Sequence, residues 1–402
     1  MIFNMNTRSI GSIFLIIGTT TGTGMLSLPL IVAACGFSTA IILLIISWSI
    51  MYIAAIKLLN TCAEYPLGAN FTSIMYSKTP KICLIFFTII YLLFTYSMLS
   101  SYISQGSSIL CNIDGINHLN KSQIGMFSIV FVLIFGALIF SYKISDYTNR
   151  IFVIFKFIFF IIAIITMLFY ININYLSDVP SGASAIIYAF PTILPAFVFH
   201  SIIPFIYEYQ KGDVKRIKKD ILISSITILV IYIIFIFASL GLVPQYNIYS
   251  FHSLFLSNNY TPNGLIGEIK AISGSNILEV VLKLFIHTAI ITSFIGVSIS
   301  IAHYIRDLFN KYGKHLSNLT LALICFIPPL IFTILYPLEF IVVLQYASIF
   351  TVIIFIYTPI LLSTKTDLKV YLSHTYMVSV GSVIILFEIF NLFYETNPFM
   401  WI

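Results

Sequence analysis

The chain has 402 residues, of which 59% are hydrophobic and only 8% are charged. A soluble domain carries about 25% charged residues, so this chain has too few polar side chains to cover a water-facing surface. A soluble enzyme, a nucleic-acid-binding protein and a disordered chain are therefore excluded. The net charge of +6 is typical of basic cytoplasmic loops in a membrane protein. The five cysteines and seven histidines form no C-x-x-C or H-x-x-x-H pair, so we expect no disulfide framework, no metal and no cofactor.

Apolar segments along the chain predict transmembrane helices, because a bilayer core needs roughly 20 apolar residues per helix. Eleven segments fit, at about 10–35, 37–59, 82–110, 124–142, 150–172, 185–208, 221–243, 278–303, 317–335, 338–362 and 370–394. The connections are short except for the polar segment 244–277, which we interpret as an external loop with a short helix. We expect an all-α membrane protein that forms a single domain over residues 1–402.

The positions of lysine and arginine predict the orientation in the membrane. With the N-terminus in the cytoplasm, the inner segments hold all of the 20 Lys and Arg residues except Lys121, Lys270 and Lys283. Positively charged loops remain on the cytoplasmic side, which favours an odd number of helices with the C-terminus outside. Arg8 precedes an apolar run, but glycines interrupt that run and ten further spans follow, so we expect no cleaved signal peptide.

The first apolar segment contains seven consecutive residues that form helices poorly. Glycine and β-branched threonine have low helix propensity, and glycine lets the backbone leave α geometry at little cost. The segment is either a close-packing G-x-x-x-G face or an interruption of the helix. Its residues are Gly18, Thr19, Thr20, Thr21, Gly22, Thr23 and Gly24.

The sixth apolar segment carries Pro191, Pro195 and Pro204 around residues 197–200. Proline inside a helix removes a hydrogen bond and clashes one turn back, which gives a simple kink or a full break. Interrupted helices at positions one and six lie five spans apart, and an odd offset inverts the second unit across the membrane. This is the signature of a five-plus-five inverted repeat with a substrate site at the midplane.

We therefore expect one repeat over about 10–172, a second over about 185–362, and an extra C-terminal helix over about 370–394. Unwound backbone exposes N–H and C=O groups, and half-helix N-termini carry partial positive charge. Such groups can hold the carboxylate and the ammonium of an amino acid without charged side chains in the membrane. Gly18 to Gly24 and the segment Phe197, Val198, Phe199 and His200 are the candidates to flank this site.

Short motifs along the chain resemble those of one transporter family. Gly11-Ser12-Ile13-Phe14, followed by GTTTGTGMLSLP at 18–29, closely resembles the opening of the bacterial tyrosine-specific permeases. These belong to the hydroxy/aromatic amino acid permease family, within the amino acid–polyamine–organocation superfamily. Further matches follow in order over nearly the whole chain: Tyr102-Ile103-Ser104, Asn149-Arg150, Lys156, Phe199-His200, Pro204, Thr292-Ser293-Phe294, Gly296-Val297, Pro328-Pro329-Leu330 and Tyr336-Pro337.

The resemblance implies eleven helices, the inverted-repeat fold and proton-coupled uptake of tyrosine or tryptophan across the bacterial inner membrane. The sequence departs from the family pattern at three positions. Val198 and Glu339 stand where the family has glycine, and His303 stands where an acidic residue is expected. Because Val198 adjoins the broken helix, the choice of substrate stays open.

Aromatic and ionisable residues near the breaks are candidates to contact the substrate. Phe197, Phe199 and Tyr102 are candidates to enclose an aromatic ring. His200 lies within an apolar span, where an ionisable residue indicates function. It contacts a substrate hydroxyl or relays protons, or it is a neutral imidazole that bonds a freed carbonyl. Glu208 ends the span beside a basic loop, where Lys211 or Arg216 is the expected partner.

Lys156 is the candidate for proton coupling, with two readings. Near the cytoplasmic end of its span, its long stem can reach water. In sodium-coupled members of this fold, hydroxyls of the kind found at Thr292 and Ser293 help hold a sodium ion between spans one and eight. The resemblance implies that the Lys156 ammonium replaces that ion and that its loss of a proton releases the spans it joins.

The combined interpretation is a proton-coupled secondary transporter that imports an aromatic amino acid, with tyrosine favoured. Tryptophan or a broader range of neutral amino acids is the alternative. A membrane enzyme is disfavoured because no catalytic set or phosphate loop has usable spacing. A channel is disfavoured because the spans are polar mainly at the two breaks. The partners expected are the substrate, protons and the lipid bilayer, with no nucleic acid and no prediction of oligomeric state.

Overall fold

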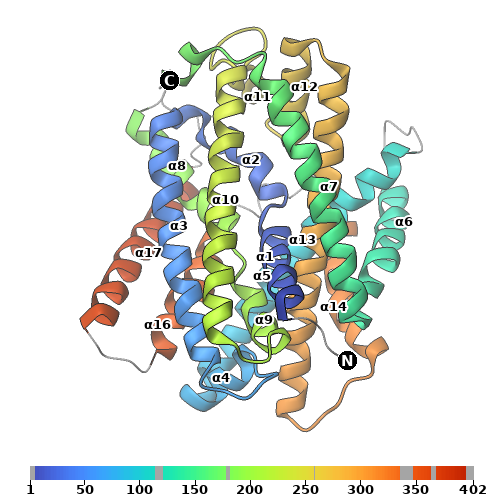
Figure 1. Ribbon diagram of the computed structural model, residues 1–402, viewed down its shortest axis with the longest axis vertical. Helices are drawn as coiled ribbons and strands as arrows, with labels where there is room; N and C mark the ends of the chain where they lie inside the picture. The colour runs from blue at the N-terminus through green and yellow to red at the C-terminus, as the bar shows by residue number, and fades with distance from the viewer. Residues whose placement is uncertain are drawn as a thin grey trace.

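The computed structural model describes residues 5–113, 121–177, 182–257, 259–335, 347–363 and 368–394, and within these ranges every regular element is helical. Figure 1 shows the long helices running roughly side by side along the longest axis of the molecule. Eight helices of the described residues are long and apolar enough to cross a membrane, or nine if a bent pair counts as one span. A multi-pass membrane fold is therefore confirmed.

Seven of the spans are single helices whose positions follow the predicted apolar segments. The predicted start at 150 was eight residues late, because polar residues from Tyr142 onward already form helix. The seven are α3 (Phe37–Cys62), α5 (Lys81–Ile113), α7 (Tyr142–Leu168), α10 (Val214–Leu242), α13 (Asn276–Lys311), α14 (Asn318–Leu335) and α17 (Leu368–Tyr394).

Two predicted spans are shorter or less regular in the described residues. The segment expected at 124–142 comprises α6 (Lys121–Phe131), the π-helix η2 (Val132–Gly136) and the 3-10 helix η3 (Ala137–Phe140). The segment expected at 338–362 is described from residue 347 and ends in the π-helix η7 (Val352–Tyr357) and α16 (Thr358–Leu362). Tyr336, Pro337 and Glu339 lie outside the described residues.

The first apolar segment is interrupted where the glycine and threonine run predicts it. Helix α1 (Met5–Thr20) and helix α2 (Thr23–Val32) are bent by 49° relative to each other, and the 3-10 turn η1 (Ala33–Cys35) follows α2. Gly22, at φ −96° and ψ −149°, lies outside the helical region. The break is therefore a true interruption and not only a packing face.

The sixth apolar segment is also interrupted. Its elements are α8 (Gly182–Ile193), the 3-10 turns η5 (Leu194–Phe197) and η6 (His200–Ile202), and α9 (Ile203–Tyr209). Val198 is extended, at φ −78° and ψ 113°, between the two turns. Pro195 and Pro204 occupy first-turn positions of η5 and α9, where a missing N–H costs nothing. The prolines thus start new helical segments on either side of the break.

The two broken helices lie in the interior of the bundle. Figure 1 shows α1 and α2 in the middle of the molecule, among α3, α7, α10 and α13. Helix α13 packs along α7, α5 and α1, and α10 packs against α1 and α3. This arrangement buries the freed backbone groups of α1 among the side chains of three long helices.

Short helices at the two ends of the bundle complete the fold. The loop 244–277 contains two helices, α11 (Phe251–Leu256) and α12 (Pro262–Ser273), capped by Ser250 and Thr261. Helix α4 (Phe71–Lys78), capped by Asn70, lies at the opposite end of the molecule (Figure 1). The sequence analysis expected one short helix in that loop and none at α4. The 3-10 turn η4 (Ile173–Ser177) follows α7.

Candidate functional site

The carbonyl oxygens at the end of α1 are satisfied by side chains from other helices. A helix end leaves its last carbonyls without intrahelical partners. Lys156 Nζ, from α7, donates to Thr21 O at 3.1 Å and lies 3.4 Å from Gly18 O. Ser293 Oγ, from α13, lies 3.2 Å from Gly18 O and 3.1 Å from Thr19 O. The break is thus held from two sides.

Tyr232 of α10 joins the two broken helices to each other. Its hydroxyl lies 3.1 Å from Thr20 O at the end of α1 and 2.6 Å from Ala196 O in η5. The Tyr232 side chain is fully buried, and the ring of Phe197 packs edge-on against it at 5.1 Å. One phenol therefore fixes the spacing between the first and the second break.

Lys156 lies deep in the bundle and does not extend to the surface. The residue is 3% exposed, and its third contact is Thr292 Oγ1 at 2.9 Å. All three partners of the ammonium are neutral oxygens. The structure thus brings together the three residues predicted for proton coupling, Lys156, Thr292 and Ser293, at the end of α1.

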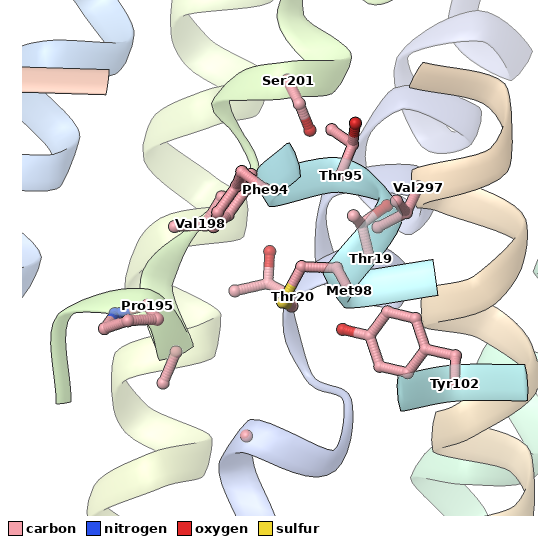
Figure 2. A pocket seen from close by; sticks show the side chains of 12 residues that line it. Thr19, Thr20, Phe94, Thr95, Met98, Tyr102, Pro195, Val198, Ser201 and Val297 are labelled. Carbon is pink, nitrogen blue, oxygen red and sulfur yellow. The ribbon is translucent and has the colours of Figure 1, made fainter. Parts of the chain in front are cut away.

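A small enclosed cavity lies between the two breaks (Figure 2). Its volume of about 30 Å³ is far below the roughly 300 Å³ of the smallest usual ligand pockets, so an aromatic side chain enters only if the walls move apart. Helices α1, α2, α5 and α13 and the turns η5 and η6 supply the walls. The lining residues are Thr19, Thr20, Gly24, Phe94, Thr95, Met98, Tyr102, Pro195, Ala196, Val198, Ser201 and Val297.

Five of the residues predicted to bind substrate line this cavity: Thr19, Thr20, Gly24, Tyr102 and Val198. Thr19 and Thr20 donate their hydroxyls to carbonyls one turn back in α1, at 2.7 Å each, so these hydroxyls remain available only as acceptors.

The remaining residues of the first break lie beside the cavity. Thr21 donates to Ile17 O at 2.6 Å, and Thr23 begins α2. Gly18 and Gly22 lie so close to neighbouring helices that there is no space for a side chain. A Cβ at Gly22 would lie 2.3 Å from Ser293 Oγ. These glycines allow α7 and α13 to approach the break.

Phe197, Phe199 and His200 do not line the cavity. The extended residue Val198 separates the two turns, and the aromatic side chains on either side of it pack into the protein. His200 Nε2 lies 2.9 Å from Met51 O of α3, and the His200 ring contacts those of Phe199 and Phe355 at 4.9 and 5.3 Å. The sequence analysis gave a bond between the imidazole and a carbonyl freed by the break as one interpretation of His200. The imidazole does bond a backbone carbonyl, but this carbonyl belongs to α3 and not to the broken helix.

Several cavity residues were not singled out in the sequence analysis. Phe94 and Met98 lie eight and four residues before Tyr102, so all three lie on one face of α5. Helical spacing from Tyr102 is the sequence signal that predicts them. Thr95 lies seven residues before Tyr102 and shares this signal, and Val297 belongs to the Gly296-Val297 motif quoted above. Ser201 carries no comparable signal in the sequence alone.

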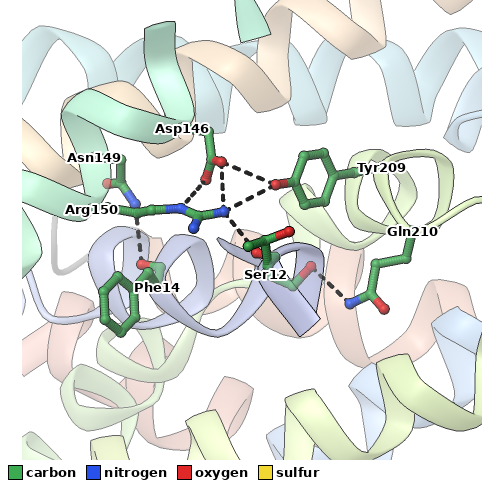
Figure 3. A network of polar contacts seen from close by, with 8 residues as sticks. Ser12, Phe14, Asp146, Asn149, Arg150, Tyr209 and Gln210 are labelled. Atoms are coloured by element: carbon green, nitrogen blue, oxygen red, sulfur yellow. Dashed lines mark hydrogen bonds and ion pairs between the residues drawn. The ribbon is translucent and has the colours of Figure 1, made fainter. Parts of the chain in front are cut away.

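A polar network holds the half of α1 that precedes the break (Figure 3). Arg150 of α7 donates to Asp146 from Nε at 3.0 Å and from Nη2 at 2.7 Å, and to Thr7 O at 2.8 Å. The Tyr209 hydroxyl donates to Asp146 at 3.0 Å. Asn149 Nδ2 donates to Phe14 O at 3.2 Å. These contacts fasten α1 to α7 and to the end of α9.

The opposite side of the same half-helix is held by a buried carboxylate of α10. Asp220 accepts from Ser9 Oγ at 2.5 Å and from Gln210 Nε2 at 2.6 Å, and Gln210 Nε2 also lies 2.8 Å from Ser12 Oγ. Helix α1 is therefore fastened to α7 on one side and to α10 on the other. Releasing this end of α1 requires both sets of contacts to break.

The expected partners of Glu208 were wrong. Its carboxylate accepts from His303 Nε2 at 2.8 Å, and His303 Nδ1 lies 2.8 Å from Asn70 Nδ2. Lys211 adopts a left-handed backbone, at φ 54°, and turns the chain away after α9. His303, which stands where the family has an acidic residue, thus joins α13 to the N-terminus of α4.

Two interrupted helices that meet at a cavity inside an apolar helical bundle define a membrane transporter and not an enzyme. The chain belongs to the tryptophan/tyrosine permease family, whose sequence model matches residues 5–395. This match confirms the family resemblance of the motifs quoted above.

Individual relatives extend the match over most of the chain. Tyrosine-specific transport system 1 of Haemophilus influenzae is 32% identical over 346 residues, covering 85% of this chain and 84% of that protein. Tyrosine-specific transport system 2 of the same organism is 28% identical, covering 91% and 89%. The low affinity tryptophan permease of Escherichia coli is 27% identical, covering 89% and 87%.

The fold is similar to that of a solved transporter structure. Mhp1, a nucleobase-cation-symport-1 family transporter in a closed conformation with bromovinylhydantoin bound, matches with a TM-score of 0.62 at 12% identity. The match covers 98% of this chain and 94% of that one. At this level of identity the likeness concerns the fold alone.

Proposed function

We propose that this permease imports an aromatic amino acid, with tyrosine preferred, by proton-coupled secondary active transport. The observation that carries the proposal is the cavity at the meeting point of the two helix breaks, in a chain whose relatives include two tyrosine-specific transport systems. Tryptophan is the alternative substrate, because other relatives are tryptophan permeases.

The backbone of the amino acid is proposed to bind at the first break. The N-terminus of α2, at Thr23 and Gly24, offers backbone N–H groups and the positive end of a helix dipole to a carboxylate, whereas the Gly22 N–H already donates to Thr20 O. Carbonyl oxygens of the two breaks accept from the ammonium, since each carbonyl has two lone pairs. Tyr102 lines the same cavity beside this N-terminus and contributes a hydroxyl.

The proposed topology has eleven spans in the bacterial inner membrane, with the N-terminus in the cytoplasm and the C-terminus in the periplasm. It counts the bent pair and the two shorter apolar helices, Gly125–Phe140 and Ala347–Leu362, as spans. The repeats cover about 10–172 and 185–362, and the helix at about 370–394 is additional. Support comes from the two breaks, which fall in the first and the sixth span as an inverted repeat requires.

Proton coupling is proposed to run through Lys156. As an ammonium, Lys156 holds the end of α1 to α7 and, through Thr292, to α13. As a neutral amine it donates fewer hydrogen bonds and carries no charge, so its hold on the end of α1 weakens and the contacts of Ser293 remain. Lys156 would thus gain a proton from outside and lose it to the cytoplasm, and each change would move the helix bundle between an outward-open and an inward-open conformation.

The test measures uptake of labelled tyrosine in cells that lack their own aromatic permeases. Wild-type uptake is expected to need a proton gradient and no sodium, and an uncoupler abolishes accumulation. The Lys156→Met variant is expected to exchange tyrosine across the membrane without accumulating it. Lys283→Met is the matched control, because Lys283 is an exposed residue that pairs with Glu279 at the far end of α13.

The outcomes separate the parts of the proposal. Full accumulation by Lys156→Met, or a strict sodium requirement in the wild type, removes Lys156 from coupling and leaves the substrate assignment intact. Stronger competition by unlabelled tryptophan than by unlabelled tyrosine favours the alternative substrate. Absence of uptake of either amino acid by a correctly inserted wild type overturns the proposed function.

A further inference from the structure

The cavity has a polar end that the proposed backbone contacts do not use. Ser201 and Thr95 lie at one end of the cavity in the view of Figure 2, and Tyr102 lies at the other. If the carboxylate and ammonium bind between Tyr102 and the N-terminus of α2, the substrate ring extends toward Ser201 and Thr95. These two hydroxyls then face the far edge of the ring.

Ser201 has a hydroxyl with its hydrogen-bonding capacity unused. The residue is 4% exposed, and among the described residues its side chain has no hydrogen-bond partner. Its backbone is fixed, because Ser300 Oγ of α13 donates to Ser201 O at 2.8 Å and Tyr91 lies 3.0 Å from Ser300 Oγ. Because Ser201 lines the cavity, this hydroxyl without a protein partner is available to a ligand that enters it.

Thr95 complements Ser201, because its own proton is already engaged. Thr95 Oγ1 donates to Tyr91 O, one turn back in α5, at 2.8 Å. The oxygen therefore remains as an acceptor only, whereas the Ser201 hydroxyl is free to donate. One donor and one acceptor together match a phenolic hydroxyl, which both accepts and donates.

We propose that Ser201 and Thr95 bind the phenolic hydroxyl of the transported amino acid and so determine selectivity for tyrosine over phenylalanine. This inference rests on the proposed function. The Ser201 hydroxyl donates to the phenolic oxygen, the phenol donates to Thr95 Oγ1, and Thr95 continues to donate to Tyr91 O. Val198, Phe94 and Met98 supply apolar walls along the ring.

The arrangement ranks the three aromatic substrates. Tyrosine satisfies both Ser201 and Thr95. The indole of tryptophan has one N–H donor and no acceptor, so it can satisfy Thr95 but leaves the Ser201 donor without a partner. Phenylalanine satisfies neither residue. A site that bonds a substrate hydroxyl rejects the analogue without it far more strongly than an apolar pocket rejects a missing methylene.

The experiment measures kcat/KM for uptake of labelled tyrosine and phenylalanine by the full-length protein in permease-deficient cells. In Ser201→Ala and in Thr95→Val, the tyrosine-to-phenylalanine ratio is expected to fall roughly 5- to 100-fold, because each variant removes one hydrogen bond to the phenol. Thr95→Ser keeps the hydroxyl and is expected to keep the ratio. Phenylalanine uptake reports whether each variant is folded and inserted.

Ser47→Ala is the matched control. Ser47 is a fully buried serine of α3 whose hydroxyl also has no partner, but it does not line the cavity. An unchanged ratio in Ser201→Ala, while the wild type transports tyrosine, overturns this inference and leaves the proposed function standing. Absence of aromatic uptake in the wild type overturns the proposed function itself. An equal loss of ratio in Ser47→Ala also overturns the assignment to Ser201.

Discussion

Replacing Gly296 by alanine is expected to force α1 and α13 apart at the first helix break. A Cβ at position 296 would lie 1.9 Å from Thr19 Oγ1 and 2.7 Å from Thr19 Cβ. Rotation of the threonine side chain moves its hydroxyl, which is held by Leu15 O, but cannot move its Cβ. The backbones must therefore separate by roughly 0.7 Å to restore an ordinary contact of 3.4 Å.

Two opposing effects set the size of the change. Overpacking of this kind costs about 1–3 kcal/mol, whereas alanine gains about 1 kcal/mol over glycine inside a helix. The net loss of stability is therefore small, about 0–2 kcal/mol. The loss of transport is expected to be larger, roughly 10- to 100-fold, because Thr19 lines the cavity and small displacements of binding groups strongly reduce turnover.

The assay compares tyrosine uptake with the thermal midpoint of the purified protein. Gly267→Ala is the matched control, because a Cβ at this helical glycine of α12 would meet nothing within 4 Å. The control is expected to keep full uptake with equal or higher thermal stability. Wild-type uptake by Gly296→Ala at normal membrane abundance would show that the close contact between α1 and α13 is not needed for transport, and would refute the reasoning.

Two further predictions concern the contacts that hold the broken helices. Tyr232→Phe leaves Thr20 O and Ala196 O without their shared donor and is expected to lower stability by about 1–3 kcal/mol and to raise the KM for tyrosine. Tyr96→Phe, which loses one bond to Ile324 O away from the cavity, is the control, and an equal rise in its KM would contradict the bridging role. Asp146→Asn leaves Arg150 without its charge partner and is expected to free the first half of α1. In a variant whose five native cysteines are replaced by serine, labelling of a single cysteine introduced at Leu15 should then rise roughly 5- to 30-fold, for a loss of about 1–2 kcal/mol in the free energy that keeps α1 closed. Asp213→Asn is the control and should leave the labelling rate unchanged. Asp213 forms a solvent-exposed ion pair with Arg216 and caps the N-terminus of α10, and asparagine can also cap a helix.

The two helix breaks are predictable from the sequence because their causes are local. The run from Gly18 to Gly24 lowers helix propensity at every position, and Pro195 and Pro204 start new helical segments wherever they stand. The apolar spans follow from composition for the same reason. The family motifs add Lys156, Thr292 and Ser293, which lie far apart in the chain and which no local pattern connects.

The direction of individual side chains at the second break is not predictable in this way. Whether His200 faces the cavity or α3 depends on the backbone at Val198, where an extended residue between two turns sets the rotation of everything that follows. His200 binds Met51 O, 149 residues away in the chain. Only the folded bundle reveals that the next residue, Ser201, lines the cavity and that His200 does not.

Ion pairing at the ends of the spans fails for a related reason. Glu208 lies within a few residues of Lys211 and Arg216, and proximity in sequence favours those partners. The left-handed turn at Lys211 separates them, and His303 reaches Glu208 from α13 instead. Sequence distance is a weak guide to charge pairing wherever a chain reverses direction between spans.

Interrupting a helix costs free energy, and the side chains that hold the end of α1 determine whether this cost is met during folding or during transport. Lys156, Ser293 and Tyr232 occupy the carbonyls of this end, and all three belong to helices other than α1. The interruption is therefore formed during folding and not induced by the arriving substrate. Binding free energy is then free to shift the equilibrium between outward and inward states, because none of it is consumed in opening a helix.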